Sequence, residues 1–169
     1  MRARNEKAML ALGRRLAAEL KPGDVVTLSG PLSAGKTTLV RGLLAGLGHK
    51  GEVPSPSFAL VQPYEMLKLP VWHVDLYRID DPSELDELGL DEAGEEGVLL
   101  VEWPEHAGRK AWPRALALSL EVLEDGARAL TAEVPAACGP FERPHGSASA
   151  RPAHTTRRSP PARSRRGPS

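Results

Sequence analysis

Cysteine is almost missing from this sequence of 169 residues, since Cys138 is the only one. A single cysteine excludes an intrachain disulfide, and no Cys/His cluster has the spacing of a zinc site. The sequence also lacks an apolar run of about 20 residues, so it predicts no membrane-spanning helix. Charged residues interrupt the stretch from Met9 to Leu20, which therefore does not resemble the apolar core of a signal peptide. We expect a cytoplasmic protein with no membrane partner and no disulfide partner.

Net charge is also lacking, because 22 basic residues balance 22 acidic ones. The two signs are unevenly distributed along the chain. Seven of the basic residues, all arginines, but only one acid lie from Cys138 onward. The first part of the chain is therefore mildly acidic, and the last part is basic.

A glycine-containing loop between two apolar segments is the most informative feature that is present. It reads G-P-L-S-A-G-K-T over residues 30–37 and follows the apolar run 25–29. Leucine and valine then recur at helical spacing over residues 39–47. A strand, a glycine loop and a helix in this order are typical of a phosphate-binding P-loop. The sequence therefore predicts a site for a nucleoside triphosphate.

The chemistry of such a loop assigns roles to particular residues. Gly30 and Gly35 allow backbone N–H groups to approach an anion closely, and the following helix N-terminus favours negative charge. Lys36 is placed to reach the β- and γ-phosphates as a catalytic residue, and the Thr37 hydroxyl is a suitable ligand for Mg²⁺. We thus expect ATP and Mg²⁺ as cofactors. The residues expected to contact the nucleotide are Pro31, Leu32, Ser33, Ala34, Gly35, Lys36, Thr37 and Thr38.

The remaining pattern predicts one α/β domain over residues 1–135, with a mixed, mostly parallel sheet and helices on both sides. Hydrophobic periodicity and turn residues give its elements. The expected helices cover residues 4–20, 36–47 and the segment from Asp81-Pro82 to Gly89. The expected strands cover residues 25–29, 58–62, 71–75 and 98–101, and a hairpin joins 116–122 to 130–134 through Asp125-Gly126.

Two acids stand at the ends of predicted strands. Asp75 ends the segment 71–75, and Glu102 directly follows the apolar run 98–101. Ligands in open α/β sheets bind at the carboxyl ends of strands, where an acid can hold Mg²⁺ opposite the Thr37 hydroxyl. The alternatives are a loop cap for Asp75 and a strand-end salt bridge for Glu102. We interpret both as catalytic and metal-site residues, and the sequence does not decide which one touches the metal.

Three further residues are candidates for a switch or a partner contact. Ser57 stands where a hydroxyl could sense the γ-phosphate, although a capping role fits its spacing equally well. His73 is equally compatible with a packed side chain and with a ligand. Trp103 is either an aromatic at the edge of the core or part of a contact surface.

After residue 135 the periodic pattern stops. Residues 136–169 are rich in Pro, Ser, Ala, Gly and Arg, and Phe141 is their only large apolar residue. Such a composition cannot bury enough apolar surface to offset chain entropy, so it predicts a disordered tail. The arginines could contact RNA phosphates, or the tail could be an extension with no role of its own.

Four ordered motifs together resemble the TsaE family, also called YjeE, over about residues 6–123. The family shows G-x-L-G-A-G-K-T-T, S-P-T-F, H-x-D-x-Y-R and E-W segments. Their counterparts here are Gly30 to Thr38, Ser55 to Phe58, His73 to Arg78 and Glu102-Trp103. Three positions depart from the pattern: Ser33 replaces a usual Gly, Pro31 replaces a common acid, and Ser57 replaces Thr while keeping the hydroxyl.

The resemblance implies a small P-loop ATPase of bacterial tRNA threonylcarbamoyladenosine synthesis. Such a protein acts with a TsaB–TsaD pair, and reaches tRNA indirectly through that complex, without transferring the threonylcarbamoyl group itself. The sequence leaves rivals open. A small-molecule kinase needs a lid, for which residues 63–70 are a short candidate. The absence of an Asn-Lys-x-Asp segment counts against a GTP-dependent switch. The third alternative is an interaction module whose altered loop no longer binds nucleotide.

Overall fold

Seven strands form one mixed sheet in the order β1-β7-β6-β2-β5-β4-β3. This computed structural model describes residues 1–108 and 111–135. The strands are β1 (Arg2–Ala3), β2 (Val25–Ser29), β3 (Val61–Tyr64), β4 (Val71–Asp75), β5 (Val98–Glu102), β6 (Leu116–Val122) and β7 (Arg128–Glu133). The four central strands are parallel, and the outer pairings to β7, β1 and β3 are antiparallel. The predicted mixed α/β sheet is confirmed.

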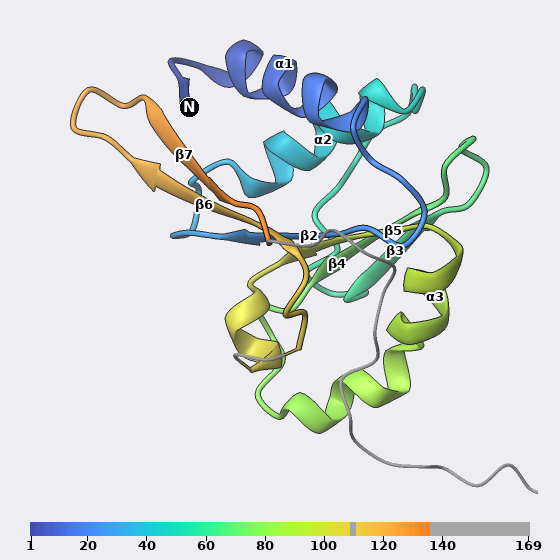
Figure 1. Cartoon of the computed structure of the whole chain (residues 1–169). Coiled ribbons are helices and arrows are strands. Elements are labelled where there is room, and N and C mark those ends of the chain that lie inside the picture. Colours follow the sequence, from blue (N-terminus) through green and yellow to red (C-terminus); the bar gives the residue numbers. More distant parts are fainter. Residues whose placement is uncertain (109–110, 136–169) are drawn as a thin grey trace, which may run out of the picture.

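Helices cover both faces of the sheet (Figure 1). The helices α1 (Glu6–Ala17) and α2 (Lys36–Gly46) pack on one face. The other face carries the 3₁₀ helix η1 (Pro82–Leu88), α3 (Leu90–Glu96) and the 3₁₀ helix η2 (Pro104–Ala107). Every residue of β5 is buried, as its continuous apolar sequence requires for a strand covered on both sides. The faces of the central strands are therefore covered, whereas the carboxyl ends of these strands open into a cleft.

The helices α1 and α2 approach each other through glycine. A Cβ built on Gly13 would lie 2.5 Å from the Leu39 carbonyl oxygen, and one on Gly42 would lie 2.5 Å from the Leu10 carbonyl oxygen. Both distances are closer than van der Waals contact, so no larger residue fits while the helices stay in place. This contact fixes α2, and with it the loop that precedes α2, against the rest of the core.

Several element boundaries differ from the prediction. The strand expected at 58–62 begins only at Val61, because Leu60 has a left-handed φ of 62° and its N–H bonds to the Pro56 carbonyl oxygen at 2.7 Å. The helix after Asp81 is a 3₁₀ helix with a capping box, and α3 follows Gly89, where the sequence predicted only a stop. The short strand β1 and the helix η2 were also not predicted. The proposed tail lies outside the described residues.

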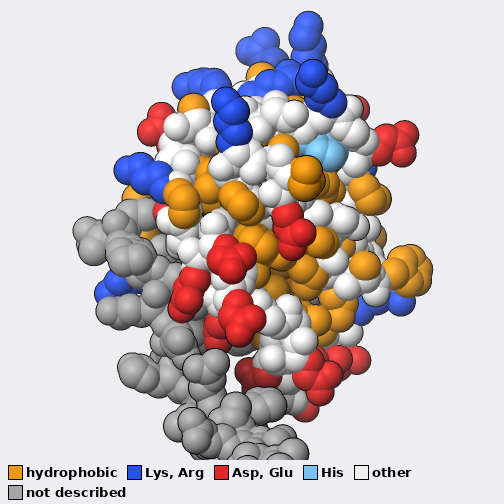
Figure 2. All heavy atoms as spheres, turned by 90° about the vertical axis from the view of Figure 1, so that its right-hand side faces the viewer, with side chains coloured by type: hydrophobic (Ala, Val, Ile, Leu, Met, Phe, Trp, Pro, Cys, Tyr) orange, Lys and Arg blue, Asp and Glu red, His pale blue; other side chains and the backbone are white. Residues whose placement is uncertain are grey.

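Charge and apolar surface separate on the side of the molecule seen in Figure 2. Hydrophobic side chains gather in the middle of this view, with acidic side chains beside and below them. Basic side chains gather at the top, which is the side of α1 and α2 in Figure 1. Among the described residues, no helix is long and apolar enough to cross a membrane.

Candidate nucleotide-binding site

The ends of neighbouring strands bring the predicted loop and both predicted acids to one edge of the sheet. The strand β5 lies between β2 and β4, and its Glu102 is in register with Leu28 on one side and Asp75 on the other. The loop after Ser29 starts from the same edge. The expectation that Asp75 and Glu102 lie beside the loop is therefore confirmed.

The loop requires glycine at its first position. Gly30 has a φ of 134°, and a Cβ there would lie 2.4 Å from the Leu120 carbonyl oxygen. At the other end of the loop, α2 begins at Lys36 with no side-chain hydrogen bond capping its N-terminus. The first N–H groups of a helix lack partners within the helix, so this end suits an anion.

Ser33 adopts a left-handed backbone conformation with a φ of 63°. At this position the loop motif of the family that the sequence resembles usually has glycine. A non-glycine residue is strained in this region, at a cost of about 1–2 kcal/mol. The loop therefore has a backbone conformation that favours glycine, although a serine occupies this position.

Lys36 is folded back onto its own loop. Its Nζ donates hydrogen bonds to the carbonyl oxygens of Gly30 at 2.7 Å and Pro31 at 3.0 Å. The same atom lies 3.7 Å from the centre of the Trp103 ring, a cation–π contact. Burial lowers the pKa of Lys36 from its ordinary value of 10.5, while the nearby carboxylates, Glu102 first, oppose this shift. Lys36 thus provides a partly desolvated positive charge at the loop.

Thr37, Glu102 and His73 form a chain of polar contacts beneath the loop. The Thr37 hydroxyl donates to Glu102 Oε1 at 2.9 Å and Oε2 at 3.2 Å. His73 Nε2 lies 2.8 Å from the same Oε1. Glu102 and His73 are buried. The arrangement joins a hydroxyl and a carboxylate, two hard oxygen donors of the kind that Mg²⁺ prefers.

Asp75 has a different set of partners. Its Oδ2 accepts hydrogen bonds from the hydroxyls of Ser55 and Ser57, each at 2.8 Å, and its Oδ1 accepts from the Tyr77 N–H at 3.0 Å. The two hydroxyls lie 3.0 Å apart. Asp75 therefore ties the segment after α2 to the end of β4. Ser55 was not among the predicted site residues, although its position two residues before Ser57 was a signal for it.

Trp103 belongs to a small aromatic group at the mouth of the site. It has a left-handed φ of 59°, and its ring centre lies 5.0 Å from that of Tyr77 and 6.3 Å from that of His106. Arg78 places its guanidinium 4.1 Å from the centre of the Phe58 ring. Tyr77 and Trp103 thus form one wall of the site.

These groups surround a cleft of about 220 Å³. Its lining residues are Leu32, Ser33, Gly35, Lys36, Thr37, Thr38, Ser55, Ser57, Asp75, Tyr77, Glu102 and Trp103. Three predicted residues do not line it: Pro31, Ala34 and His73. Ala34 packs in the core, and His73 lies buried behind Glu102. No group of three or more His, Cys, Asp or Glu side chains within the described ranges could hold a metal, so a cation here would depend on few protein ligands.

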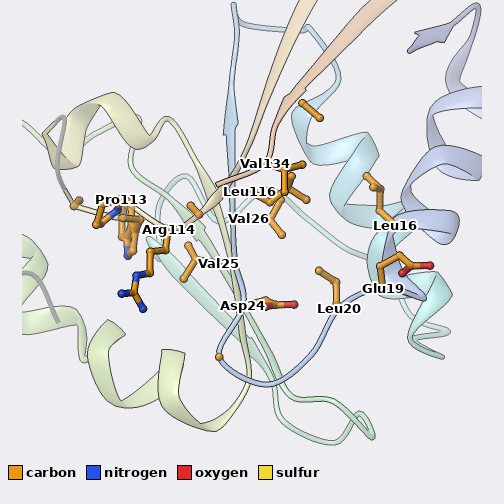
Figure 3. A pocket seen from close by; sticks show the side chains of 15 residues that line it. Leu16, Glu19, Leu20, Asp24, Val25, Val26, Pro113, Arg114, Leu116 and Val134 are labelled. Carbon is orange, nitrogen blue, oxygen red and sulfur yellow. The ribbon is translucent and has the colours of Figure 1, made fainter. Parts of the chain in front are cut away.

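A second cavity, of about 300 Å³, lies at the opposite end of β2 (Figure 3). Val25 and Val26 of β2 line it together with Leu16, Leu116 and Val134. Figure 3 shows that carboxylates of Glu19 and Asp24 stand at its side. Its lining is mainly apolar, so it does not suit a triphosphate. The polar cleft is therefore the candidate site.

Comparison with known proteins identifies relatives over most of the described chain. The family model for the threonylcarbamoyl adenosine biosynthesis protein TsaE matches residues 3–130. Relatives named tRNA threonylcarbamoyladenosine biosynthesis protein TsaE include one from Rickettsia felis, 38% identical over 125 residues, which are 73% of this chain and 73% of the relative. One from Bacillus subtilis is 47% identical over 100 residues, which are 59% of this chain and 62% of the relative.

The fold agrees with this relationship. The crystal structure of YdiB from Bacillus subtilis superimposes with a TM-score of 0.69 at 35% identity, covering 79% of this chain and 83% of the other. The family match spans the loop, both strand-end acids and the segments that contact them. The chain therefore belongs to the TsaE family, whose relatives are named for tRNA threonylcarbamoyladenosine biosynthesis.

Proposed function

We propose that this chain binds and hydrolyses ATP with Mg²⁺ as an accessory protein of tRNA threonylcarbamoyladenosine modification. The observation that carries the proposal is the Thr37–Glu102 hydrogen bond at the uncapped N-terminus of α2, with Lys36 beside it. Positive charge, open helix N–H groups and hard oxygen donors are the combination that a Mg²⁺-bound triphosphate needs. The family's link to this tRNA modification supplies the biological setting.

In this proposal, different residues of the cleft hold the phosphates and the Mg²⁺. The N–H groups of the loop and of the first turn of α2 hold the phosphates, and Lys36 neutralises part of their charge. The Thr37 hydroxyl and the Glu102 carboxylate hold Mg²⁺, which when bound neutralises charge on the phosphate oxygens. Asp75, which accepts hydrogen bonds from two hydroxyls, connects the Ser55–Ser57 segment to the site, and Glu102 is the acid that we assign to the metal.

We further propose that the chain acts with the TsaB–TsaD pair and meets tRNA only through that complex. Support comes from family membership, since the relatives carry the name of this biosynthesis. We expect slow hydrolysis by the isolated chain, because the Lys36 ammonium is held by two loop carbonyls and one aromatic ring.

The test is ATP hydrolysis by the purified full chain, alone and then with TsaB–TsaD and tRNA. We expect slow turnover alone, an increase with the partners, and loss of turnover when EDTA removes Mg²⁺. Absence of ATP binding and of hydrolysis in all of these mixtures would overturn the proposal. It would leave an interaction module whose loop, with Pro31 and Ser33, no longer holds nucleotide.

The position of the lid candidate weighs against a small-molecule kinase. Residues 63–70 form the tip of the β3–β4 hairpin, where Tyr64 pairs with Val71. The cleft lies at the other end of β4, beside Asp75. Phosphoryl transfer from ATP to an added metabolite, measured in the absence of TsaB–TsaD, would favour the kinase instead.

A further inference from the structure

His73 lies inside the sheet and reaches the end of a neighbouring strand. It is fully buried in β4, in register with Leu100 of β5, and its Nε2 lies 2.8 Å from Glu102 Oε1. Residues two apart on a strand share a face of the sheet. His73 and Glu102 therefore share the face that α1 and α2 cover, and their contact runs diagonally across two paired strands.

The partners of the ring determine which nitrogen carries the proton. An ionised carboxylate only accepts hydrogen bonds, so Nε2 must be the donor in this contact. The other ring nitrogen, Nδ1, is buried and has no hydrogen-bond partner among the described residues. A buried N–H without a partner is costly, so the neutral ring with its proton on Nε2 fits this environment best.

Two donors thus converge on one oxygen of Glu102. His73 and the Thr37 hydroxyl both contact Oε1, and the hydroxyl lies slightly farther from Oε2. A glutamate side chain has several rotatable bonds, which these contacts restrict to one arrangement. The carboxylate is fixed relative to the Thr37 hydroxyl before any ligand arrives.

We propose that His73 is a positioning residue that orients the Glu102 carboxylate for the Mg²⁺ of a bound nucleotide. The inference rests on the proposed function, because it assigns the metal to Thr37 and Glu102. Groups that hydrogen-bond to metal ligands commonly change metal affinity by about 10–100-fold when they are removed. His73 does not line the cleft, so its effect is transmitted through Glu102.

The experiment measures how strongly Mg²⁺ improves nucleotide binding. The Kd for a non-hydrolysable ATP analogue is measured by calorimetry with EDTA and with Mg²⁺, and the ratio of the two values is the Mg²⁺ effect. We expect H73L to reduce this ratio about tenfold by removing the donor to Glu102. H73Q should keep most of it, because the glutamine amide can present an N–H near the position of Nε2.

A matched control separates positioning from packing. Val71 lies on the same face of β4, is fully buried and belongs to the core. V71A should lower the unfolding temperature and leave the Mg²⁺ effect unchanged. An unchanged Mg²⁺ effect in H73L, or an equal loss in H73L and H73Q, would overturn the positioning role.

A second measurement does not need nucleotide. Nitrogen-15 NMR of the full chain should show His73 protonated at Nε2, with a signal that shifts in E102Q. Protonation at Nδ1 alone would overturn the positioning role and leave the proposed function intact. Conversely, NMR could show the Nε2 tautomer while the unmodified chain binds no nucleotide. That result would overturn the proposed function and the assignment to Mg²⁺, and the His73–Glu102 contact would stand.

Discussion

The polar cleft and the apolar cavity lie at opposite ends of β2 and differ in chemistry more than in size. The cleft combines the Lys36 ammonium, the Thr37 hydroxyl and two buried carboxylates within about 220 Å³. The cavity, at about 300 Å³, is larger and is lined mainly by side chains such as Leu16 and Leu116. Of these two, the larger one has a lining that does not suit a triphosphate, so the chemistry of the lining and not the volume distinguishes them.

The difference follows from the backbone of the sheet. At the carboxyl ends of the central strands the chain turns through a loop into α2, which leaves helix N–H groups open beside Asp75 and Glu102. At the amino end of β2, Val25 and Val26 line an apolar cavity together with Leu16 of α1 and Leu20, which follows α1. Changes in the cleft should alter nucleotide binding, whereas changes in the cavity should alter stability.

The largest effect is expected from Lys36→Ala. Removing the loop's buried cation should reduce ATP hydrolysis by on the order of 100-fold or more, since it stabilises developing phosphate charge. The fold should persist, because the side chain contributes an ammonium rather than core volume to the site. Steady-state hydrolysis and circular dichroism measure the two quantities. Near-normal turnover would remove Lys36 from the catalytic residues.

Leu116→Ala should have the opposite effect, lowering stability while nucleotide binding stays unchanged. Leu116 lines the apolar cavity and packs against the core, so truncation should lower the free energy of unfolding by about 1–2 kcal/mol. Urea denaturation measures this loss, and calorimetry with an ATP analogue should give an unchanged Kd. A weakened Kd at full stability would show that the two ends of the sheet are coupled.

Ser33→Gly should raise the free energy of unfolding by relieving backbone strain in the loop that lines the cleft. Glycine removes the left-handed strain at a φ of 63°, although it also increases the entropy of the unfolded chain. The net gain in unfolding free energy should be about 1 kcal/mol or less. Thermal unfolding measures it. A destabilised S33G protein would mean that the serine side chain makes a compensating contact.

The smallest effect concerns pH. Burial lowers the pKa of Lys36 in the folded chain below its ordinary 10.5. In the proposed function the charged ammonium holds the nucleotide, so affinity should fall a few-fold as alkaline pH rises through the lowered pKa. Stability of the nucleotide-free chain should rise over the same window, up to 10.5, because the unfolded chain then binds more protons.

Titrations of Kd and of unfolding temperature from pH 7 upward, with Lys36→Ala as the control, test this pair of opposite trends. In that variant the contribution of this group to both trends should vanish. Identical pH profiles in the two proteins would contradict the burial of a titrating ammonium.

The sequence predicted the strands that a short segment can specify by its own hydrophobic pattern. Apolar runs predicted β2 and β5 close to their observed bounds, because a strand buried on both faces needs a continuous apolar stretch. The prediction of a strand at 58–62 was wrong at its start, because the turn at Leu60 depends on a bond back to Pro56. The sequence did not predict the helix α3, because Leu90 and Ala93 are its only buried apolar side chains.

The sequence by itself determined the loop of residues 30–38, because a P-loop is one contiguous segment whose glycines, lysine and threonine act where they stand in the chain. Only the tertiary structure decided the partners of the acids. Parallel pairing of β4 with β5 brings His73 to Glu102 across 29 positions, and the return of the chain brings Ser55 and Ser57 to Asp75. Contacts between residues distant in sequence depend on strand order and register, which no single segment encodes.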